Sequence, residues 1–315
     1  HKLEFYGIRG VALEWFKSYL NNRKQYVDYN GVQSDLLGIR TGVPQGSVLG
    51  PLLFLIYIND IVNVSKYLQL ILFADDTNIF LHHNDLDSLQ KLTYFELDNM
   101  SKWFKVNRLS LNIKKTNYII FSPKSKHHQI GTFIIQIDGK TLERVKHTKF
   151  LGVYIDEKLK WDEHVHQVST KMSKNIGILG KLKHLLNTSV LLQLYNTLVL
   201  PYLNYCNVVW TTASETLLNK VYVLQKKAIR IINKSAFRAH TDPLFKNNNL
   251  LTVKQIRQYQ LLGFLYKFVH GLLPPVFKNH FNMAADMHTY NTRMANNSGL
   301  AISFARTNRR KRLLR

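Results

Sequence analysis

The sequence is poor in cysteine and in long apolar runs. The single cysteine, Cys206, excludes a disulfide scaffold and any zinc or iron–sulfur site built from several cysteines. It is typical of a reducing, intracellular setting. The two longest apolar stretches, residues 48–58 and 190–209, are interrupted by proline and amide residues and stay short of the roughly 20 apolar residues of a membrane span. The sequence therefore predicts no membrane-spanning segment.

Acidic residues are also scarce. The chain has 20 Asp and Glu against 43 Lys and Arg, a net charge of +23 over 315 residues. Such an excess indicates a polyanionic partner, either nucleic acid or an anionic membrane face. Nucleic acid is favoured, and no membrane partner is expected. Hydrophobic residues make up 45% and aromatic residues 12%, which excludes wholesale disorder. The length predicts about two domains.

Periodicity predicts an α+β first half and a mostly helical second half. Apolar residues recur every three or four positions in residues 10–21 and 86–106, and again on a face that runs from Val165 to Leu179 behind a predicted Asp162 cap. Asn30-Gly31 and Asp138-Gly139 predict hairpin turns. Further helices are predicted at 189–199, 214–233 and 253–270, and strands at 68–73, 77–81, 117–121, 133–137 and 149–155.

Two adjacent carboxylates, Asp75 and Asp76, stand between the apolar strands 68–73 and 77–81. Like charges this close repel each other unless a cation neutralises them, and Mg²⁺ prefers carboxylate oxygens together with substrate phosphates. The pattern is compatible with a metal-holding turn or with an ordinary solvated turn, in which Asp is common.

A glycine-rich segment, residues 42–51, precedes the carboxylates and leads into an apolar helix. Such a turn lets the backbone approach a phosphate or a base closely. Within it, Ser47 is a candidate helix N-cap, and the Gln45 side chain offers both a donor and an acceptor. Taken alone, the segment is equally compatible with a plain turn.

These segments together resemble the palm of reverse transcriptases, most closely that of non-LTR (LINE-type) retrotransposons. The resemblance covers at least residues 1–285 and follows the family's motif order. The motifs are residues 42–54, Ile58-Asn59-Asp60-Ile61, Phe73-Ala74-Asp75-Asp76, residues 109–121 around Lys114-Lys115-Thr116, and Phe150-Leu151-Gly152-Val153-Tyr154-Ile155-Asp156.

The resemblance implies RNA-templated DNA synthesis with two Mg²⁺ ions, using an RNA template, a DNA primer and dNTPs, in the nucleus or the cytoplasm. It implies a truncated palm with a small antiparallel sheet at 1–156, a helical thumb-like region at 157–285 and a basic tail at 286–315. The implied roles are metal ligands for Asp75 and Asp76, a nucleotide and template pocket for Gln45, Gly46 and Ser47, a leaving-group contact for Lys115 or its neighbour Lys114, and a primer grip for Phe150, Leu151 and Gly152. A strand-core role stays open for Leu151.

The sequence departs from the family in one respect. The motif that supplies another catalytic aspartate, expected before the helix at residues 10–21, is not among residues 1–315. Because one carboxylate source is missing, we expect this polypeptide alone to be an inactive fragment. The alternatives are a reverse transcriptase like the group II intron maturases and a non-catalytic nucleic-acid-binding remnant.

Several other features carry weaker predictions. The histidine pairs 82–83, 127–128 and 164/166 lack a third ligand at a recognisable spacing, so we expect surface residues. Tyr202, Tyr205 and Trp210 stack bases or pack the helical core, and core packing is favoured. The basic residues between 306 and 315 bind nucleic acid, act as a nuclear signal or form a solvated end.

Overall fold

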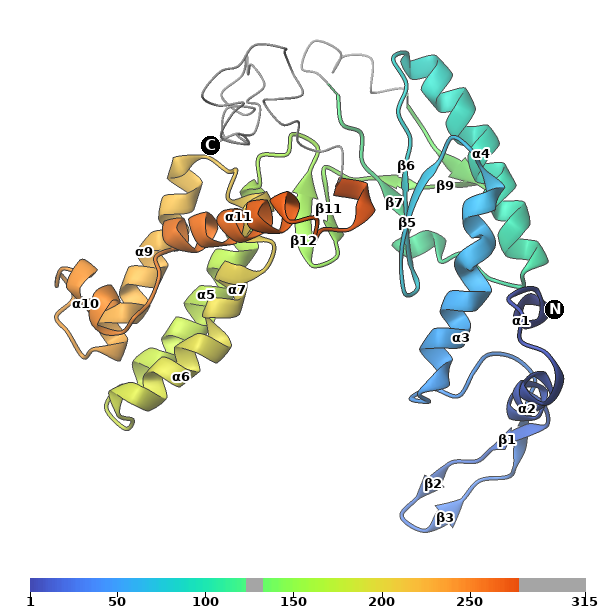
Figure 1. Cartoon of the computed structure of the whole chain (residues 1–315), viewed down its shortest axis with the longest axis horizontal. Helices are drawn as coiled ribbons and strands as arrows, with labels where there is room; N and C mark the ends of the chain where they lie inside the picture. The colour runs from blue at the N-terminus through green and yellow to red at the C-terminus, as the bar shows by residue number, and fades with distance from the viewer. Residues whose placement is uncertain (123–132, 278–315) are drawn as a thin grey trace. The chain divides into compact units, whose positions relative to one another are not determined.

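The computed structural model describes residues 1–122 and 133–277, which divide into two compact units (Figure 1). The hairpin unit contains residues 1–118 and 133–144, and the helical unit contains residues 119–122 and 145–277. Helices and short strands occur together, compatible with the α+β class. The boundary between the two compact units lies before residue 145. The boundary between palm and thumb-like region, expected at 156/157, stays a prediction. The predicted tail at 286–315 lies outside the described residues.

Four α-helices belong to the hairpin unit: α1 (Lys2–Phe5), α2 (Gly10–Leu20), α3 (Leu49–Ile58) and α4 (Leu86–Val106). The helices predicted at 10–21 and 86–106 are confirmed. Helix α4 starts where it does because the Asp85 carboxylate accepts a hydrogen bond from the Ser88 amide at 2.8 Å. The buried residues include Ile58, Ile61 and Met100.

The family-like segment Ile58–Ile61 holds helix α1 in place. It includes the start of a 3₁₀ turn, η1 (Asn59–Val64). The Lys2 ammonium lies 2.8 Å from the Asp60 carboxylate and 4.6 Å from the centre of the Tyr57 ring. The Asn59 amide donates to the Tyr6 hydroxyl at 2.7 Å. Within the hairpin unit, this motif is therefore explained by packing.

Strands form only two-stranded pairs in the part of the chain that the structure describes. Five pairs are antiparallel: β1 (Arg23–Gln25) with β4 (Leu37–Ile39), β2 (Asp28–Tyr29) with β3 (Val32–Gln33), β5 (Gln69–Phe73) with β6 (Asp76–Phe80), β8 (Gln136–Ile137) with β9 (Lys140–Thr141), and β11 (His147–Phe150) with β12 (Val153–Asp156). The short strands β7 (Asn117–Tyr118) and β10 (Glu143–Arg144) pair in parallel. The expected small antiparallel sheet is wrong for these residues, because each strand has only one partner.

Turn chemistry decides which hairpins were predictable. Asn30 and Gly31 have φ of 50° and 80°, and Asp138 and Gly139 have 50° and 73°, as two-residue hairpin turns require. The Asp138 turn is tied to α4, since Ser101 and Lys105 donate to the Asp138 carboxylate at 2.8 and 2.6 Å. These two donors lower the pKa of Asp138.

The single strand predicted at 149–155 is wrong. The chain reverses inside it, at Leu151 (φ 44°) and Gly152 (φ 85°), between β11 and β12. Leu151 therefore lies in a turn, and a strand-core role for it is wrong. The prediction failed because leucine at the first position of a type I′ turn is not a recognised turn signal.

The helical unit contains the predicted long helices. They are α5 (Asp162–Leu182), α6 (Thr188–Leu198), α9 (Glu215–Ile232) and α11 (Val253–Val269), together with the shorter α7 (Leu200–Asn204), α8 (Asn207–Trp210), α10 (Asp242–Asn247) and a 3₁₀ turn, η4 (Pro275–Phe277). Helix α5 packs against α6 and α9 within this unit (Figure 1). The predicted apolar face of α5, from Val165 to Leu179, is buried in the core. No helix among the described residues is both long and apolar enough to cross a bilayer.

The predicted Asp162 cap is wrong. Trp161 occupies the N-cap position with φ of 70°, and Asp162 is the first helical residue. The preceding loop is fixed instead by Asp156, whose carboxylate accepts from the amides of Lys158, Lys160 and Trp161 at 2.7–3.0 Å. Asp156 therefore joins the end of β12 to the start of α5.

A buried glutamine ties three segments of the helical core together. Gln225 on α9 is fully buried. Its amide group donates to the Tyr195 hydroxyl at 3.0 Å and to the Leu251 carbonyl at 2.9 Å, and its oxygen accepts from the Val253 amide at 2.9 Å. Burial raises the pKa of Tyr195 to about 12, so its hydroxyl stays neutral. A satisfied buried amide of this kind fixes how its neighbours pack.

Candidate functional site

The carboxylate pair sits at the tip of a short apolar hairpin. In the β5–β6 register, Phe73 pairs with Asp76, so Ala74 and Asp75 alone make the turn. Ala74 adopts φ of 51°, a left-handed conformation that is uncommon for alanine. Asp75 and Asp76 are both exposed. The predicted strand–acidic turn–strand arrangement is confirmed.

The two carboxylates fit part of a magnesium site. Mg²⁺ in proteins takes one or two carboxylates and completes its shell with waters and substrate phosphates. Among the described residues, no group of three or more His, Cys, Asp or Glu side chains gathers around a common point. Asp75 and Asp76 would therefore supply two carboxylates, and a Mg²⁺ ion held there would need further oxygen ligands to complete its shell.

The glycine-rich segment folds as a turn followed by helix α3. The predicted Ser47 N-cap is wrong, because Val48 occupies the N-cap position of α3. Ser47 lies one residue earlier, and its hydroxyl accepts from the Gly50 amide at 3.1 Å. A methyl group at Gly50 would lie 2.9 Å from the Ser47 Oγ atom, so glycine is needed there for packing. Gln45 and Gly46 are exposed, with Gly46 at φ of 78°.

The requirement for glycine at position 50 was not recognised in the sequence. The only sequence feature that could have indicated this requirement is the presence of a glycine as the second residue of an apolar helix.

The lysines of the next motif are exposed and close to a 3₁₀ turn, η2 (Ile113–Lys115). The Asn112 side chain accepts from the Lys115 amide at 3.3 Å. Within the described residues, no ion pair joins Lys114 or Lys115 to Asp75 or Asp76. The choice between Lys115 and Lys114 stays a prediction.

The predicted primer grip is the β11–β12 turn of the helical unit. Gly152 is exposed there, whereas Val153 is buried in the helical core. The Tyr205 hydroxyl donates to the Leu151 carbonyl at 2.5 Å. A methyl group at Gly152 would meet the Tyr205 ring at 3.2 Å, so the turn and this ring are in close contact.

The aromatic residues of this region have different environments. Trp210 is fully buried and Tyr202 packs on the edge of the core, as predicted. Tyr205 is 53% exposed, so a core position for it is wrong. Tyr205 follows the end of α7 in an extended conformation, and the next residue, Cys206, has φ of 48°. The Cys206 thiol raises the pKa of Tyr205, so the hydroxyl keeps its proton and donates.

A surface position for His164 is also wrong. His164 on α5 is 4% exposed and packs against the Trp210 ring at 5.5 Å. Its Nδ1 atom accepts from the Tyr154 amide at 3.3 Å, which leaves the proton on Nε2. Burial, and secondarily the charge of Lys171, lower its pKa from 6.5 to about 4. His82, His83 and His166 are exposed as expected, and the pair 127–128 lies outside the described residues.

Positive charge is concentrated in the helical unit. Residues 145–277 contain 18 Lys and Arg against six Asp and Glu, whereas residues 1–118 and 133–144 contain 15 against 13. Lys171, Lys174 and Lys181 are exposed at spacings of three and seven, so they share one face of α5. This lysine face is an extended surface that suits a polyanion.

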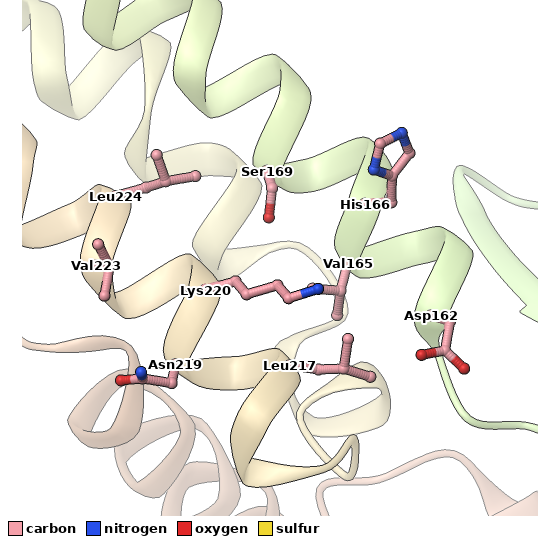
Figure 2. A pocket seen from close by; sticks show the side chains of 9 residues that line it. All are labelled: Asp162, Val165, His166, Ser169, Leu217, Asn219, Lys220, Val223 and Leu224. Atoms are coloured by element: carbon pink, nitrogen blue, oxygen red, sulfur yellow. The ribbon is translucent and has the colours of Figure 1, made fainter.

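An open pocket of about 420 Å³ lies between α5 and α9. Figure 2 shows Lys220 extending from α9 toward α5, and Ser169 pointing inward from α5. The apolar side chains of Val165, Leu217 and Leu224 form much of the wall. Lys220, which lines this pocket, is a further basic residue of the helical unit.

Comparison with known proteins identifies the first half of the chain. The family model for reverse transcriptase (RNA-dependent DNA polymerase) matches residues 1–155. Residues 1–155 belong to the reverse transcriptase family. The match includes the glycine-rich segment, the carboxylate hairpin and the β11–β12 turn, and it confirms the family that the motifs predicted.

Similar reverse transcriptases occur in transposable elements. The chain is 28% identical to the "probable RNA-directed DNA polymerase from transposon X-element" of Drosophila melanogaster over 249 residues, covering 75% of this chain and 26% of that protein. It is 29% identical to the "RNA-directed DNA polymerase from mobile element jockey" of Drosophila funebris over 240 residues, covering 71% and 25%. The chain thus spans about a quarter of these relatives' length. Its resemblance to LINE-type reverse transcriptases is confirmed.

Proposed function

We propose that this chain is part of an RNA-directed DNA polymerase of a non-LTR retrotransposon, which copies an RNA template onto a DNA primer from dNTPs. The observation that carries the proposal is the exposed Asp75–Asp76 pair on an apolar hairpin inside the segment of family similarity. The named relatives come from transposable elements, which favours this reading over one like the group II intron maturases.

Asp75 and Asp76 would hold Mg²⁺, which would lower the pKa of the primer 3′-hydroxyl and neutralise the charge of the nucleotide phosphates. In the transfer, the 3′-oxygen forms a bond to the α-phosphorus of the dNTP. The bond to the β-phosphate oxygen breaks, and pyrophosphate leaves. Lys115, an exposed cation, is proposed to stabilise the charge on the leaving group or to donate a proton to it.

Three other residues are proposed to position the incoming nucleotide and the template base. The Ser47 hydroxyl accepts from the Gly50 amide and retains its own proton for donation. Gln45 is exposed and offers an amide that both donates and accepts, and Gly46 leaves room for a base or sugar against the backbone. The Phe150–Gly152 turn is proposed to contact the primer end.

Primer extension by residues 1–315 on an RNA template with Mg²⁺ tests this proposal. These residues contain one of the family's two carboxylate motifs, so we expect template–primer binding without incorporation. Incorporation that disappears in Asp75→Ala would contradict the expected inactivity and would establish the site. Incorporation that persists in Asp75→Ala would contradict the assignment of Asp75.

A nucleic-acid-binding role without catalysis is the second candidate, and the charge of the helical unit favours it. Phosphate contacts give an affinity that falls steeply with salt. Salt-dependent binding with no incorporation, even after a polypeptide carrying the other carboxylate motif is supplied, would support this candidate. No binding at low salt would contradict both functions.

A further inference from the structure

The Leu151–Gly152 turn has a conformation that its own sequence does not favour. Both residues have positive φ, which defines a type I′ turn. A left-handed conformation is unfavourable for leucine. Contacts from outside the turn must therefore stabilise this conformation and hold the Leu151 carbonyl in place.

Tyr205 makes the contact that fixes it. Its hydroxyl donates to the Leu151 carbonyl at 2.5 Å, and its ring lies against Gly152, where a methyl group would be 3.2 Å away. The hydrogen bond holds the carbonyl on one face, and the ring blocks a side chain at position 152. Both contacts stabilise the observed type I′ form.

Tyr205 is itself held by the helical core. The indole of Trp210, which is fully buried, donates to the Tyr205 carbonyl at 2.9 Å. The second strand of the hairpin is held by the same core, since His164 accepts from the Tyr154 amide and Val153 is buried. The turn is therefore connected to a rigid part of the helical unit through Tyr205.

We propose that Tyr205 is a positioning residue for the Phe150–Gly152 turn and thereby for the 3′-terminal nucleotide of the primer. The proposal rests on the proposed function of that turn. Tyr205 acts through the Leu151 carbonyl and needs no contact with the reacting atoms. Loss of its hydroxyl alone releases the carbonyl and leaves the ring in place.

Amide hydrogen exchange without nucleic acid tests the contact with the turn. Peptides spanning residues 147–156 are compared in the wild type, in Tyr205→Phe and in Tyr202→Phe, the same substitution three residues earlier on α7. We expect exchange in these peptides to be at least about threefold faster in Tyr205→Phe and unchanged in the control. Equal exchange in all three proteins overturns the proposal.

Photo-crosslinking then tests the effect on the primer. An RNA template is annealed to a DNA primer with 4-thiothymidine at its 3′ end, and crosslinked residues are mapped by mass spectrometry. We expect crosslinks to residues 150–152 in the wild type and about fivefold fewer in Tyr205→Phe at the same total binding. An undiminished yield in Tyr205→Phe overturns the positioning role.

The two measurements separate this proposal from the function on which it rests. A wild type that binds the template–primer but gives no crosslink to the β11–β12 hairpin overturns the proposed primer grip, whatever Tyr205 does. Faster exchange and fewer crosslinks in Tyr205→Phe, with exchange unchanged in Tyr202→Phe, support both proposals.

Discussion

The two units of this protein differ in how far they bury their apolar side chains and in their net charge. The helical unit buries a continuous core that includes Tyr195, Trp210 and Gln225, and it carries most of the excess positive charge. The hairpin unit is nearly balanced in charge and leaves large apolar side chains exposed, among them Phe5 and Val11 at 88% and Val48 at 93%.

Under the proposed function, this difference would separate the chemistry from the binding. The hairpin unit contains the exposed carboxylates of Asp75 and Asp76, which are proposed to hold a divalent cation. The helical unit offers a rigid framework whose cations suit the phosphates of a long nucleic acid. Each of the following predictions tests one side of this comparison.

The largest effect, a loss of stability, is expected for substitution of the buried Gln225 in the helical core. Gln225→Leu leaves the Tyr195 hydroxyl, the Leu251 carbonyl and the Val253 amide without this partner, and we expect a loss of about 3–5 kcal/mol in the free energy of unfolding. Guanidinium unfolding followed by tryptophan fluorescence measures it. Gln193→Leu, at an exposed position on α6, is the control and should change stability by less than about 0.5 kcal/mol. Similar losses in the two variants would contradict the role of the buried amide.

The next effect concerns the lysine face of α5. Changing Lys171, Lys174 and Lys181 together to Gln should weaken RNA–DNA duplex binding by up to about 100-fold near 0.1 M salt and reduce the salt slope by about 2–3. Fluorescence anisotropy at several salt concentrations gives both values. The matched control changes Lys24, Lys66 and Lys91, which are exposed in the hairpin unit. Equal losses in the two triple variants would remove the proposed difference between the units.

Acid should destabilise the helical unit through His164. Its pKa is about 4 in the folded chain and 6.5 as a free side chain, so the unfolded state takes up the proton first. The stabilisation by neutral His164 is fully present above about pH 6.5 and is lost as the pH falls toward 4, by at most about 3 kcal/mol. Lys171 is the charged group that acts on it.

Urea unfolding between pH 4 and 7.5 measures this loss. His164→Asn keeps an acceptor near the Tyr154 amide but does not titrate, so its stability should depend less on pH. A pH dependence equal to that of the wild type would assign the acid sensitivity to other groups.

The smallest effect compares one left-handed residue in each unit. Ala74 (φ 51°) and Cys206 (φ 48°) both adopt a conformation that glycine tolerates better. Ala74→Gly and Cys206→Gly should each stabilise by about 0.5 kcal/mol, because relief of strain exceeds the added freedom of the unfolded chain. Thermal unfolding measures both, with Cys206→Ala as a control that keeps the strain. A loss of stability in either glycine variant would mean that the strain at that position is negligible.

Much of the helical structure was predictable because one face of each long helix is buried. Residues Val165 to Leu179 repeat at helical spacing, and they pack inward as the spacing requires. The Asn-Gly and Asp-Gly turns were predictable for a similar reason, since their residue types tolerate positive φ. In the candidate site, local sequence signals of this kind predicted the carboxylate hairpin.

What could not be predicted depends on contacts distant in sequence. The turn at Leu151 is stabilised by Tyr205, which lies 54 positions later, so no local signal marks it. His164 looked like a surface residue because neither its neighbours in the sequence nor its spacing reveal Trp210 packed against it. The left-handed conformation of Trp161 accompanies the hydrogen bonds that the Asp156 carboxylate accepts from backbone amides of the loop. The hydrophobic pattern of the sequence does not indicate these bonds.

The two-stranded pairing described above has a consequence for handling this protein. Within residues 1–122 and 133–277 every strand has a neighbour on one side only, so backbone donors and acceptors face outward along each ladder. Exposed edges of this kind recruit further strands and favour intermolecular assembly. Lys24, Lys140 and Lys149 stand on such strands and oppose that assembly by charge repulsion. Neutralising these lysines should therefore reduce the solubility of the purified chain before it alters its fold.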